Sequence, residues 1–289
     1  MINELGEIGT SSGVLLKMWE VIVQSGSRPL VRHSHIRFEI TLITAGSGIY
    51  TVGDKKYAIK PYEIFVFASN EQHCVTEVGK DGLKMINLHF EPRYLWGRSF
   101  DRLSNVNTNF CFQHSPNFEN CIPADRARQI RGLFTSAAEE FSKKEPEYAL
   151  QIKSLLNMII VALIRDFGYF DSTLPESKDK NRIIRKATEY IDTHFQENLT
   201  LETLAGLSGL TPNYFSSLFS KVSGIKLWDY INSRRIEAAM QLLKSESNLN
   251  IIEIASKCGF NNTANFNKAF KKTVGITPGE YRLNDNIII

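Results

Sequence analysis

The order of apolar and polar residues along the chain predicts two kinds of structure. Between about residues 14 and 112, apolar residues occur in short runs that are rich in β-branched and aromatic side chains. Turn-forming residues such as the Gly53-Asp54 pair separate these runs. Short strands with turn signals every 8–12 residues or so are typical of a barrel or sandwich, and we expect one of these folds here.

From residue 123 onward, the apolar residues follow the period of an α-helix. One apolar stripe extends from Ile130 to Phe141, and a Glu-Pro pair ends it. The segment 149–167 is apolar nearly all round, which predicts a helix that is covered on more than one side. A second subunit is the cover that we favour, and packing within one chain is the alternative.

After a polar stretch at residues 171–181, which predicts a linker, residues 182–283 contain an internal duplication. In each copy a small alanine precedes a glycine by four residues, and a Phe-x3-Phe pair follows. The glycine can adopt the left-handed conformation of a tight turn between helices, so we expect two helix-turn-helix units joined by a long helix at 227–244. The corresponding residues are Ala205 and Ala255, Gly209 and Gly259, Phe215 and Phe266, Phe219 and Phe270, and Gly224 and Gly275.

Composition and charge narrow the class of protein. A length of 289 residues predicts about two domains, and 43% apolar with 22% charged residues is typical of a soluble globular protein. The net charge of +3 is too small to identify a nucleic-acid binder by itself, although residues 178–289 carry +4 and the preceding residues −1. The chain begins without a secretory signal pattern, and the apolar run near 155–164 is too short for a membrane span.

The cysteines predict the compartment. The four cysteines form no CxxC pair and are too sparse for a disulfide scaffold. A reducing, cytoplasmic location without a membrane partner is therefore expected.

Residues 251–282 resemble the signature of the AraC-type transcription regulators, and the resemblance covers about 100 residues of the C-terminal part. It implies that both second helices enter successive major-groove segments of double-stranded promoter DNA. It also implies an activator that forms a homodimer, responds to a small-molecule effector and contacts RNA polymerase.

The resemblance assigns residues to the DNA contacts. Asparagine can bond to adenine and lysine to guanine, whereas serine discriminates weakly and alanine offers only a methyl contact. The base-facing candidates are Asn213, Ser216 and Ser217 in the first unit and Thr263, Ala264, Asn265, Asn267 and Lys268 in the second. The phosphate-contact candidates are Lys221, Arg234, Lys271, Lys272 and the helix N-terminus near Thr200.

The N-terminal part resembles the cupins, because His33, His35, Glu39 and Gly46 have the spacing of the first cupin motif. His73 stands where the second motif places its histidine. Three histidines and one glutamate could hold a divalent metal. However, cupin domains attached to this type of DNA-binding domain usually act as receptors without a metal, and we favour an effector pocket with no cofactor. Its candidate residues are His33, His35, Arg37, Glu39, His73, Asn87 and His89.

Together these patterns predict a multidomain α+β protein that regulates transcription and is not an enzyme. We expect a cupin-like β-barrel at residues 1–122, a two-helix dimerisation segment at 123–170, a linker at 171–181 and an all-α DNA-binding domain at 182–289. A metal-dependent cupin enzyme with a helical appendage is the alternative, and near-stoichiometric metal in the purified protein would favour it. A protein-interaction adaptor that has lost DNA binding is the third hypothesis.

Overall fold

The computed structural model describes residues 1–10, 13–26, 33–35, 37–69, 71–91, 94, 114–169, 178–223, 225–245 and 248–283. Cys111 lies outside these ranges, and the other three cysteines are free thiols. The chain divides into two compact units, one formed mainly by residues up to 175 and the other mainly by residues from 176 onward.

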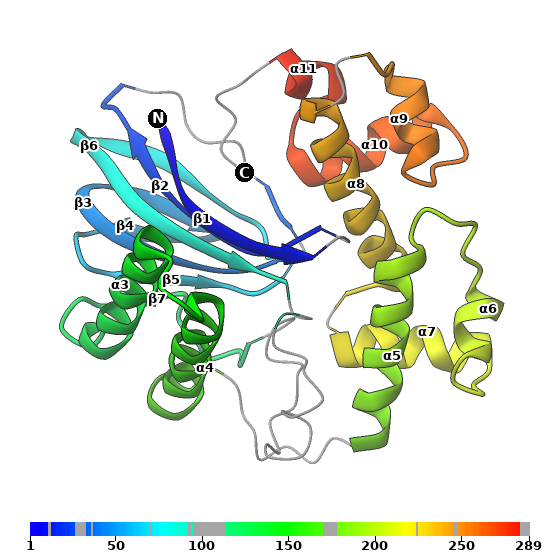
Figure 1. The fold of residues 1–289 in the computed structure, drawn as a ribbon, viewed down its shortest axis with the longest axis horizontal. Coiled ribbons are helices and arrows are strands. Elements are labelled where there is room, and N and C mark those ends of the chain that lie inside the picture. Colours follow the sequence, from blue (N-terminus) through cyan, green and yellow to red (C-terminus); the bar gives the residue numbers. More distant parts are fainter. Residues whose placement is uncertain are drawn as a thin grey trace. The chain divides into compact units, whose positions relative to one another are not determined.

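The first unit is built on a seven-stranded sheet in the order β1-β2-β6-β3-β5-β7, with β4 also paired to β3. All of its strand pairs are antiparallel, and Figure 1 shows the curved sheet that results. The strands are β1 (Ile2–Thr10), β2 (Gly13–Val23), β3 (Phe38–Val52), β4 (Lys55–Ile59), β5 (Ile64–Phe67), β6 (His73–Phe90) and β7 (Cys121–Ile122).

The two long strands give the sheet its curvature. β3 pairs with β6 along most of its length, and the register shifts near Ala45, Gly48 and Tyr50. Irregularities of this kind bend a strand and increase its twist. As a result, the first half of β3 pairs with β5 and the second half pairs with β4.

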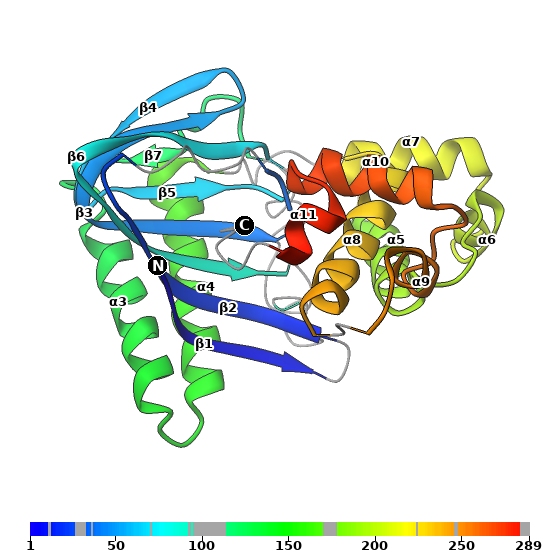
Figure 2. The ribbon, with the colours of Figure 1, turned by 90° about the horizontal axis from the view of Figure 1, so that it is seen from above.

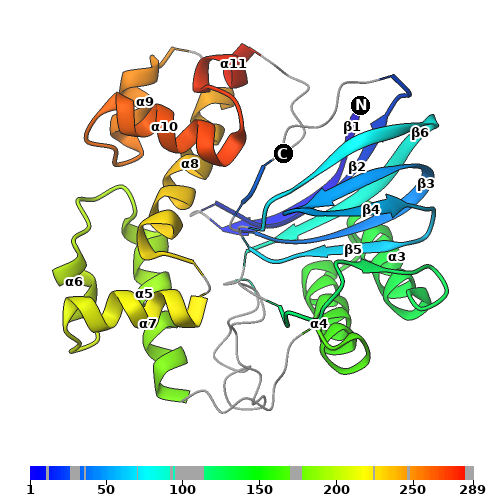
Figure 3. The same cartoon turned by 180° about the vertical axis from the view of Figure 1, so that it is seen from behind.

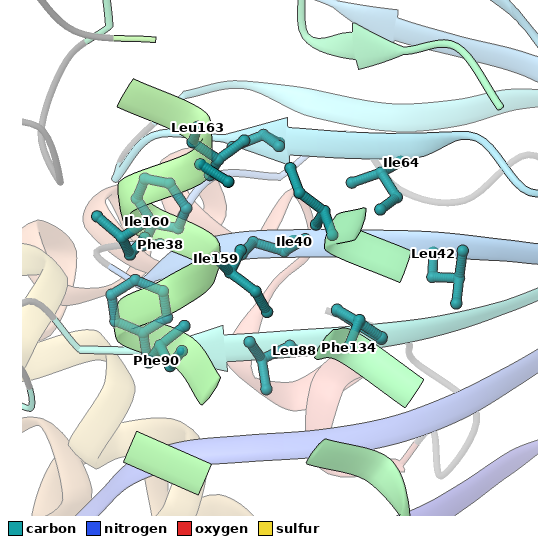
Figure 4. Packing of buried hydrophobic residues seen from close by; sticks show 14 of the residues in the cluster. Phe38, Ile40, Leu42, Ile64, Leu88, Phe90, Phe134, Ile159, Ile160 and Leu163 are labelled. Carbon is teal, nitrogen blue, oxygen red and sulfur yellow. The ribbon is translucent and has the colours of Figure 1, made fainter. Parts of the chain in front are cut away.

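Two helices, α3 (Arg128–Lys143) and α4 (Tyr148–Phe167), cover one face of this sheet (Figure 2). The apolar stripe expected between Ile130 and Phe141 is confirmed, because Ile130, Phe134 and Phe141 are fully buried or nearly so. Figure 4 shows how side chains from the sheet and the two helices meet in one cluster. The labelled members are Phe38, Ile40, Leu42, Ile64, Leu88, Phe90, Phe134, Ile159, Ile160 and Leu163.

α4 is long and apolar enough to be counted as a candidate membrane span by length and composition alone. Ile152, Leu156, Ile159 and Leu163 are buried in the cluster with the sheet, as in the core helix of a globular unit. The sheet thus covers one side of α4. A helix that is apolar nearly all round needs a cover of this kind.

From Lys178 onward, the described residues of the second unit are helical apart from short connections, and the segment 31–36 also groups with this unit. α8 runs from the α6–α7 pair to the α9–α10 pair, as Figure 3 shows. The helices are α5 (Lys178–His194), α6 (Leu201–Gly206), α7 (Pro212–Ser223), α8 (Leu227–Ser245), α9 (Ile251–Lys257), α10 (Thr263–Val274) and α11 (Pro278–Leu283).

The duplicated sequence forms two helix-turn-helix units, α6–α7 and α9–α10. Gly209 and Gly259 have φ angles of +64° and +85°, so each lies in the left-handed region that the tight turn requires. Phe215 and Phe266 are fully buried. α7 begins at Pro212, as the Thr-Pro pair predicts.

Two boundaries differ from those expected. α5 begins at Lys178, inside the expected linker 171–181, because its first turn consists of polar residues that have the composition of a linker. β1 lies before the expected strand region, since its glycines and charged residues hide a strand that pairs with β2. Residues 171–177 lie outside the described residues.

The tight turn in the second helix-turn-helix predicts an effect of Gly259→Ala. A Cβ atom there would lie 2.7 Å from the Gln196 carbonyl oxygen, in addition to the strain of a positive φ. We expect the free energy of unfolding of the full chain to fall by about 2–4 kcal/mol, measured by urea denaturation. Gly209→Ala is the matched control, because its Cβ would meet nothing within 4 Å, and it should cost about 1–2 kcal/mol. Equal losses in the two variants would contradict the role of the carbonyl contact.

Candidate nucleic-acid interface and buried polar cluster

α7, the second helix of the first helix-turn-helix, presents a polar flank. Phe215, Leu218, Phe219 and Val222 bury the opposite face of α7. Asn213 and Ser217 are exposed and Ser216 is half-buried, so the three expected base-facing residues lie outside the apolar core. The exposed Tyr214 lies beside them and was not expected from the sequence.

The corresponding helix α10 presents a more cationic flank. Phe266, Phe270 and Val274 bury its inner face. The expected base-facing residues Ala264, Asn265, Asn267 and Lys268 are exposed, and Thr263 is half-buried. The helix begins at a well-formed cap, because the Asn262 side chain accepts a hydrogen bond of 2.8 Å from the Asn265 backbone N–H.

A hollow of about 600 Å³ borders this helix on the side of α11. Its lining includes Asn267, Lys268, Lys271 and Lys272 of α10 and residues at the start of α11. Three of the expected DNA-contacting lysines thus lie at one surface depression.

The expected phosphate contacts have different surroundings. Lys221 and Lys271 are exposed, whereas the Lys272 ammonium lies 2.7 Å from the Asp229 carboxylate. The Thr200 side chain accepts a hydrogen bond of 3.1 Å from the Thr203 N–H and so caps α6. The two N–H groups that precede Thr203 in this short helix are those that could meet a phosphate.

Arg234 was expected to contact a phosphate, but its side chain is buried in the structure. Only 5% of the residue is exposed. Its Nε lies 3.0 Å from Asp192 Oδ1, and its Nη1 donates a hydrogen bond of 2.8 Å to Glu237. Tyr230 donates to the same Asp192 carboxylate, at 2.9 Å. Arg234 therefore joins α8 to α5 inside the unit, and we remove it from the phosphate contacts.

In the first unit, a buried carboxylate lies between two imidazole rings. Glu39 on β3 faces His89 on β6 in the ladder register. Its Oε2 atom lies 2.9 Å from His73 Nε2 and 2.7 Å from His89 Nε2. The three residues are at most 3% exposed, so the sheet excludes bulk water from these contacts.

The contacts of His73 determine its protonation. Its Nδ1 lies 2.8 Å from the Glu71 carbonyl oxygen, which only accepts, so Nδ1 carries a proton. A hydrogen bond from Nε2 to the ionised Glu39 then requires a second proton. Burial disfavours this charged form, but the charge and hydrogen bond of Glu39 outweigh burial and raise the pKa of His73.

Further side chains complete the cluster. Thr41 donates a hydrogen bond of 2.7 Å to Glu39 Oε1, and its hydroxyl lies 3.1 Å from Asn87 Oδ1. The His73 ring stacks on Phe67 with a centroid distance of 4.0 Å, and the His89 ring meets the Trp19 edge at 4.4 Å. Thr41 was not expected from the sequence, although it lies two residues after Glu39 and therefore shares its face of the strand.

The four residues of the cupin-like metal pattern, His33, His35, Glu39 and His73, are all buried. Glu39 and His73 lie in the first unit, whereas His33 and His35 belong to the segment 31–36, which groups with the second unit. Three imidazole nitrogens and one carboxylate suit Zn²⁺, Fe²⁺ or Mn²⁺. The carbonyl contact at His73 Nδ1 is of the kind that orients metal-bound histidines, so the chemistry of this donor set fits a divalent metal.

Two ionisable residues near the cluster lie close to carboxylates. Arg37 is 4.0 Å from the buried Glu91. His114 is only 19% exposed at its side chain and lies 3.0 Å from Glu71. No sequence spacing links either pair, because the partners are far apart in the chain.

Comparisons with known proteins agree with both parts. Residues 26–160 match the family described as the AraC-like ligand binding domain, and residues 204–284 match a helix-turn-helix domain. The chain is 37% identical over 107 residues to the transcriptional activator AarP of Providencia stuartii, a match that covers 37% of this chain and 78% of AarP. It is 23% identical over 250 residues to the activator RhaR of an Enterobacter species, covering 86% of each chain.

Other relatives match over shorter regions, and the chain spans about half the length or less of several of them. Among solved structures, ToxT of Vibrio cholerae superposes with a TM-score of 0.65 at 14% identity. This match covers 93% of this chain and 98% of that one. At this identity the likeness concerns the fold, which combines a cupin-like unit with paired helix-turn-helix units.

The His114–Glu71 pair predicts a pH dependence of stability. After the opposing effect of burial, the hydrogen bond with Glu71 raises the pKa of His114 above 6.5, and the same bond lowers the pKa of Glu71 below 4.5. A raised histidine pKa stabilises the fold below pH 6.5 and loses this effect as the pH rises through the folded-state pKa. A lowered glutamate pKa stabilises above pH 4.5 and loses this effect as the pH falls.

We therefore expect His114→Gln to lower the free energy of unfolding most between pH 4.5 and 6.5, by about 1–3 kcal/mol. The difference from the wild type should shrink on both sides of this window. Urea denaturation from pH 4 to 8.5 measures it, with Glu71→Gln as the reciprocal variant. A difference that stays constant with pH would show that the pair is not ionic.

Proposed function

Because the chain belongs to the AraC family of transcription regulators, we propose that it is a sequence-specific activator whose first unit binds a small-molecule effector. The single observation that carries this proposal is the pair of helix-turn-helix units with matching buried phenylalanines and exposed polar flanks. An enzyme would need no such pair. Family membership also favours a regulator over the cupin enzyme and the adaptor.

Base recognition is proposed for the exposed flanks of α7 and α10. Asn265 and Lys268 are three residues apart on one side of α10, and both are exposed. Their side chains offer an amide for adenine and an ammonium for guanine acceptors. On α7, Asn213 has the same capacity, whereas Ser216 and Ser217 offer weaker discrimination. Thr263, Ala264 and Asn267 complete the proposed surface of α10.

The proposed phosphate contacts are Lys221, Lys271 and Lys272, with the free N–H groups at the start of α6 near Thr200. These groups position the protein on the duplex without determining its sequence. Their number controls the salt dependence of binding, because each neutralised phosphate releases counterions.

The effector is proposed to bind at the polar cluster of the first unit, lined by His33, His35, Arg37, Glu39, His73, Asn87 and His89. It shifts the regulator between arrangements only if it binds them with different affinity. A divalent metal at His33, His35, Glu39 and His73 stays a prediction, and it would supply positive charge between the imidazoles and the carboxylate.

We propose that two copies of the chain form a homodimer through the outer side of α4, which faces away from the sheet. Leu150, Met158 and Val161 are 61%, 52% and 38% exposed, although α4 packs on the sheet with its other side. Their spacing of eight and three residues places them on one side of the helix. A second copy of α4 is an apolar cover of matching length. RNA polymerase is proposed as a further partner, as for an activator.

Base recognition predicts an unequal effect on two kinds of DNA. We expect Asn265→Ala and Lys268→Ala to weaken binding to an operator selected from random duplexes by about 1–3 kcal/mol. Binding to unselected duplex should change much less. Fluorescence anisotropy at fixed salt measures both affinities. Lys257→Ala is the control, because it removes an exposed lysine from α9. Equal losses on both duplexes would contradict base recognition.

The dimer proposal predicts that polar substitutions on α4 weaken self-association. We expect Leu150→Ser with Met158→Gln to raise the dimer dissociation constant at least about tenfold, since each exposed side chain loses apolar burial of about 1–2 kcal/mol. Sedimentation equilibrium measures it. Leu207→Ser, just after the end of α6, removes a leucine of similar exposure, 49%, and should leave the constant unchanged. An unaltered dimer in the double variant would place the interface elsewhere.

A further inference from the structure

An exposed ion pair connects α10 of the second helix-turn-helix to the start of α8, the helix that joins the two helix-turn-helix units. Lys272 lies in the last turn of α10, and Asp229 lies in the first turn of α8. The Lys272 Nζ donates a hydrogen bond of 2.7 Å to Asp229 Oδ1. The side chains are 70% and 44% exposed. DNA can therefore reach both of them.

The exposure of the pair argues against a main role in stability. Exposed ion pairs contribute little to folding, because water screens them and the long side chains lose freedom. Asp229 also gains from the N-terminal end of α8, and Lys272 from the C-terminal end of α10. These dipole effects hold each charge near its helix end, but they do not require the two side chains to meet.

A carboxylate oxygen and a phosphate oxygen compete for the same ammonium. Both are anionic acceptors that form short, charge-assisted hydrogen bonds with lysine. Lys272 stands on the flank of α10 that also carries Lys268, since the two are four residues apart. Asp229 thus occupies the position at Lys272 that a phosphate of bound DNA would take.

We propose that Asp229 is an intramolecular substitute for a DNA phosphate, which engages Lys272 in the free protein and so limits its affinity for DNA of any sequence. The proposal rests on DNA binding as the proposed function. When DNA binds, the Asp229–Lys272 pair opens and a phosphate replaces the carboxylate. The residue thereby lowers the affinity for specific and non-specific duplexes by the same factor, because the pair stabilises only the free protein and the phosphate contact that replaces it does not depend on sequence.

The proposal predicts stronger binding when the carboxylate is removed. We expect Asp229→Asn to increase affinity for a random-sequence duplex about two- to fivefold, the equilibrium constant that corresponds to an exposed ion pair. The slope of log affinity against log salt should change by much less than about 0.9, the value for one phosphate contact, because Lys272 meets a phosphate in the complex with or without Asp229. Fluorescence anisotropy between 50 and 200 mM salt measures both quantities in the full chain.

Two further variants separate competition from other effects. Lys272→Met keeps the length of the side chain without its charge, and in the Asp229→Asn background it should abolish the gain. Glu189→Gln removes the same charge from another exposed ion pair, with Arg185 on α5, which is not among the proposed DNA contacts, and should give a smaller increase. Thermal unfolding followed by circular dichroism checks that each variant is folded.

The outcomes distinguish this proposal from the proposed function. If the wild type binds DNA and Asp229→Asn binds no better than Glu189→Gln, competition by Asp229 is wrong while DNA binding stands. A lower affinity in Asp229→Asn would show that the pair positions Lys272 for DNA, which also overturns the proposal. A gain that persists without Lys272 would assign it to general charge. If the wild type shows no salt-dependent binding to any duplex, the proposed function and this inference fall together.

Discussion

The DNA-binding unit depends on the burial of two phenylalanine pairs. Phe215 and Phe219 on α7, like Phe266 and Phe270 on α10, are fully buried. Residues four positions apart lie on the same face of a helix, so each pair fixes the rotation of its helix about its own axis. A rotation by one residue would expose a phenylalanine and bury an amide or ammonium, at a cost of several kcal/mol. The exposed flanks that meet DNA are therefore determined from the inside.

Aromatic contacts extend this constraint to the helices on which the units rest. The Phe219 ring meets Tyr230 of α8 at 5.8 Å, and the Phe270 ring meets Tyr281 of α11 at 5.6 Å. Tyr230 in turn donates a hydrogen bond to Asp192, the partner of Arg234. Loss of one member of a buried ion pair typically costs about 3–5 kcal/mol, because it leaves the other charge without compensation. Arg234 thus contributes to DNA binding by holding α5 and α8 together.

The sequence predicted the features that depend on residues close together in the chain. The glycine turns, the start of α7 at Pro212 and the buried stripe of α3 follow from local spacing, and the structure confirms them. The cupin-like spacing also identified Glu39, which the fold of the first unit brings next to His73, and His33 and His35, which are buried.

What the sequence could not predict depends on pairing between distant residues. β1 becomes a strand because β2 supplies its hydrogen bonds, although its own residues have low strand propensity. Arg234 has the composition of a phosphate contact, and only the approach of α5 makes it a buried partner of Asp192. In the same way, no local pattern links Lys272 to Asp229 or His114 to Glu71.

For an effector that binds at the buried cluster of the first unit, as proposed above, the hydrogen bonds of the cluster set the size of the effect. Glu39, His73 and Thr41 already satisfy one another with hydrogen bonds of 2.7–2.9 Å. A ligand that displaces one of these bonds has to replace it, because an unsatisfied buried polar group costs about 1–3 kcal/mol. The coupling free energy between an effector and a distant site is typically about 1–3 kcal/mol as well. One hydrogen bond that the ligand makes in one arrangement of the regulator, and not in the other, is therefore large enough to control DNA binding.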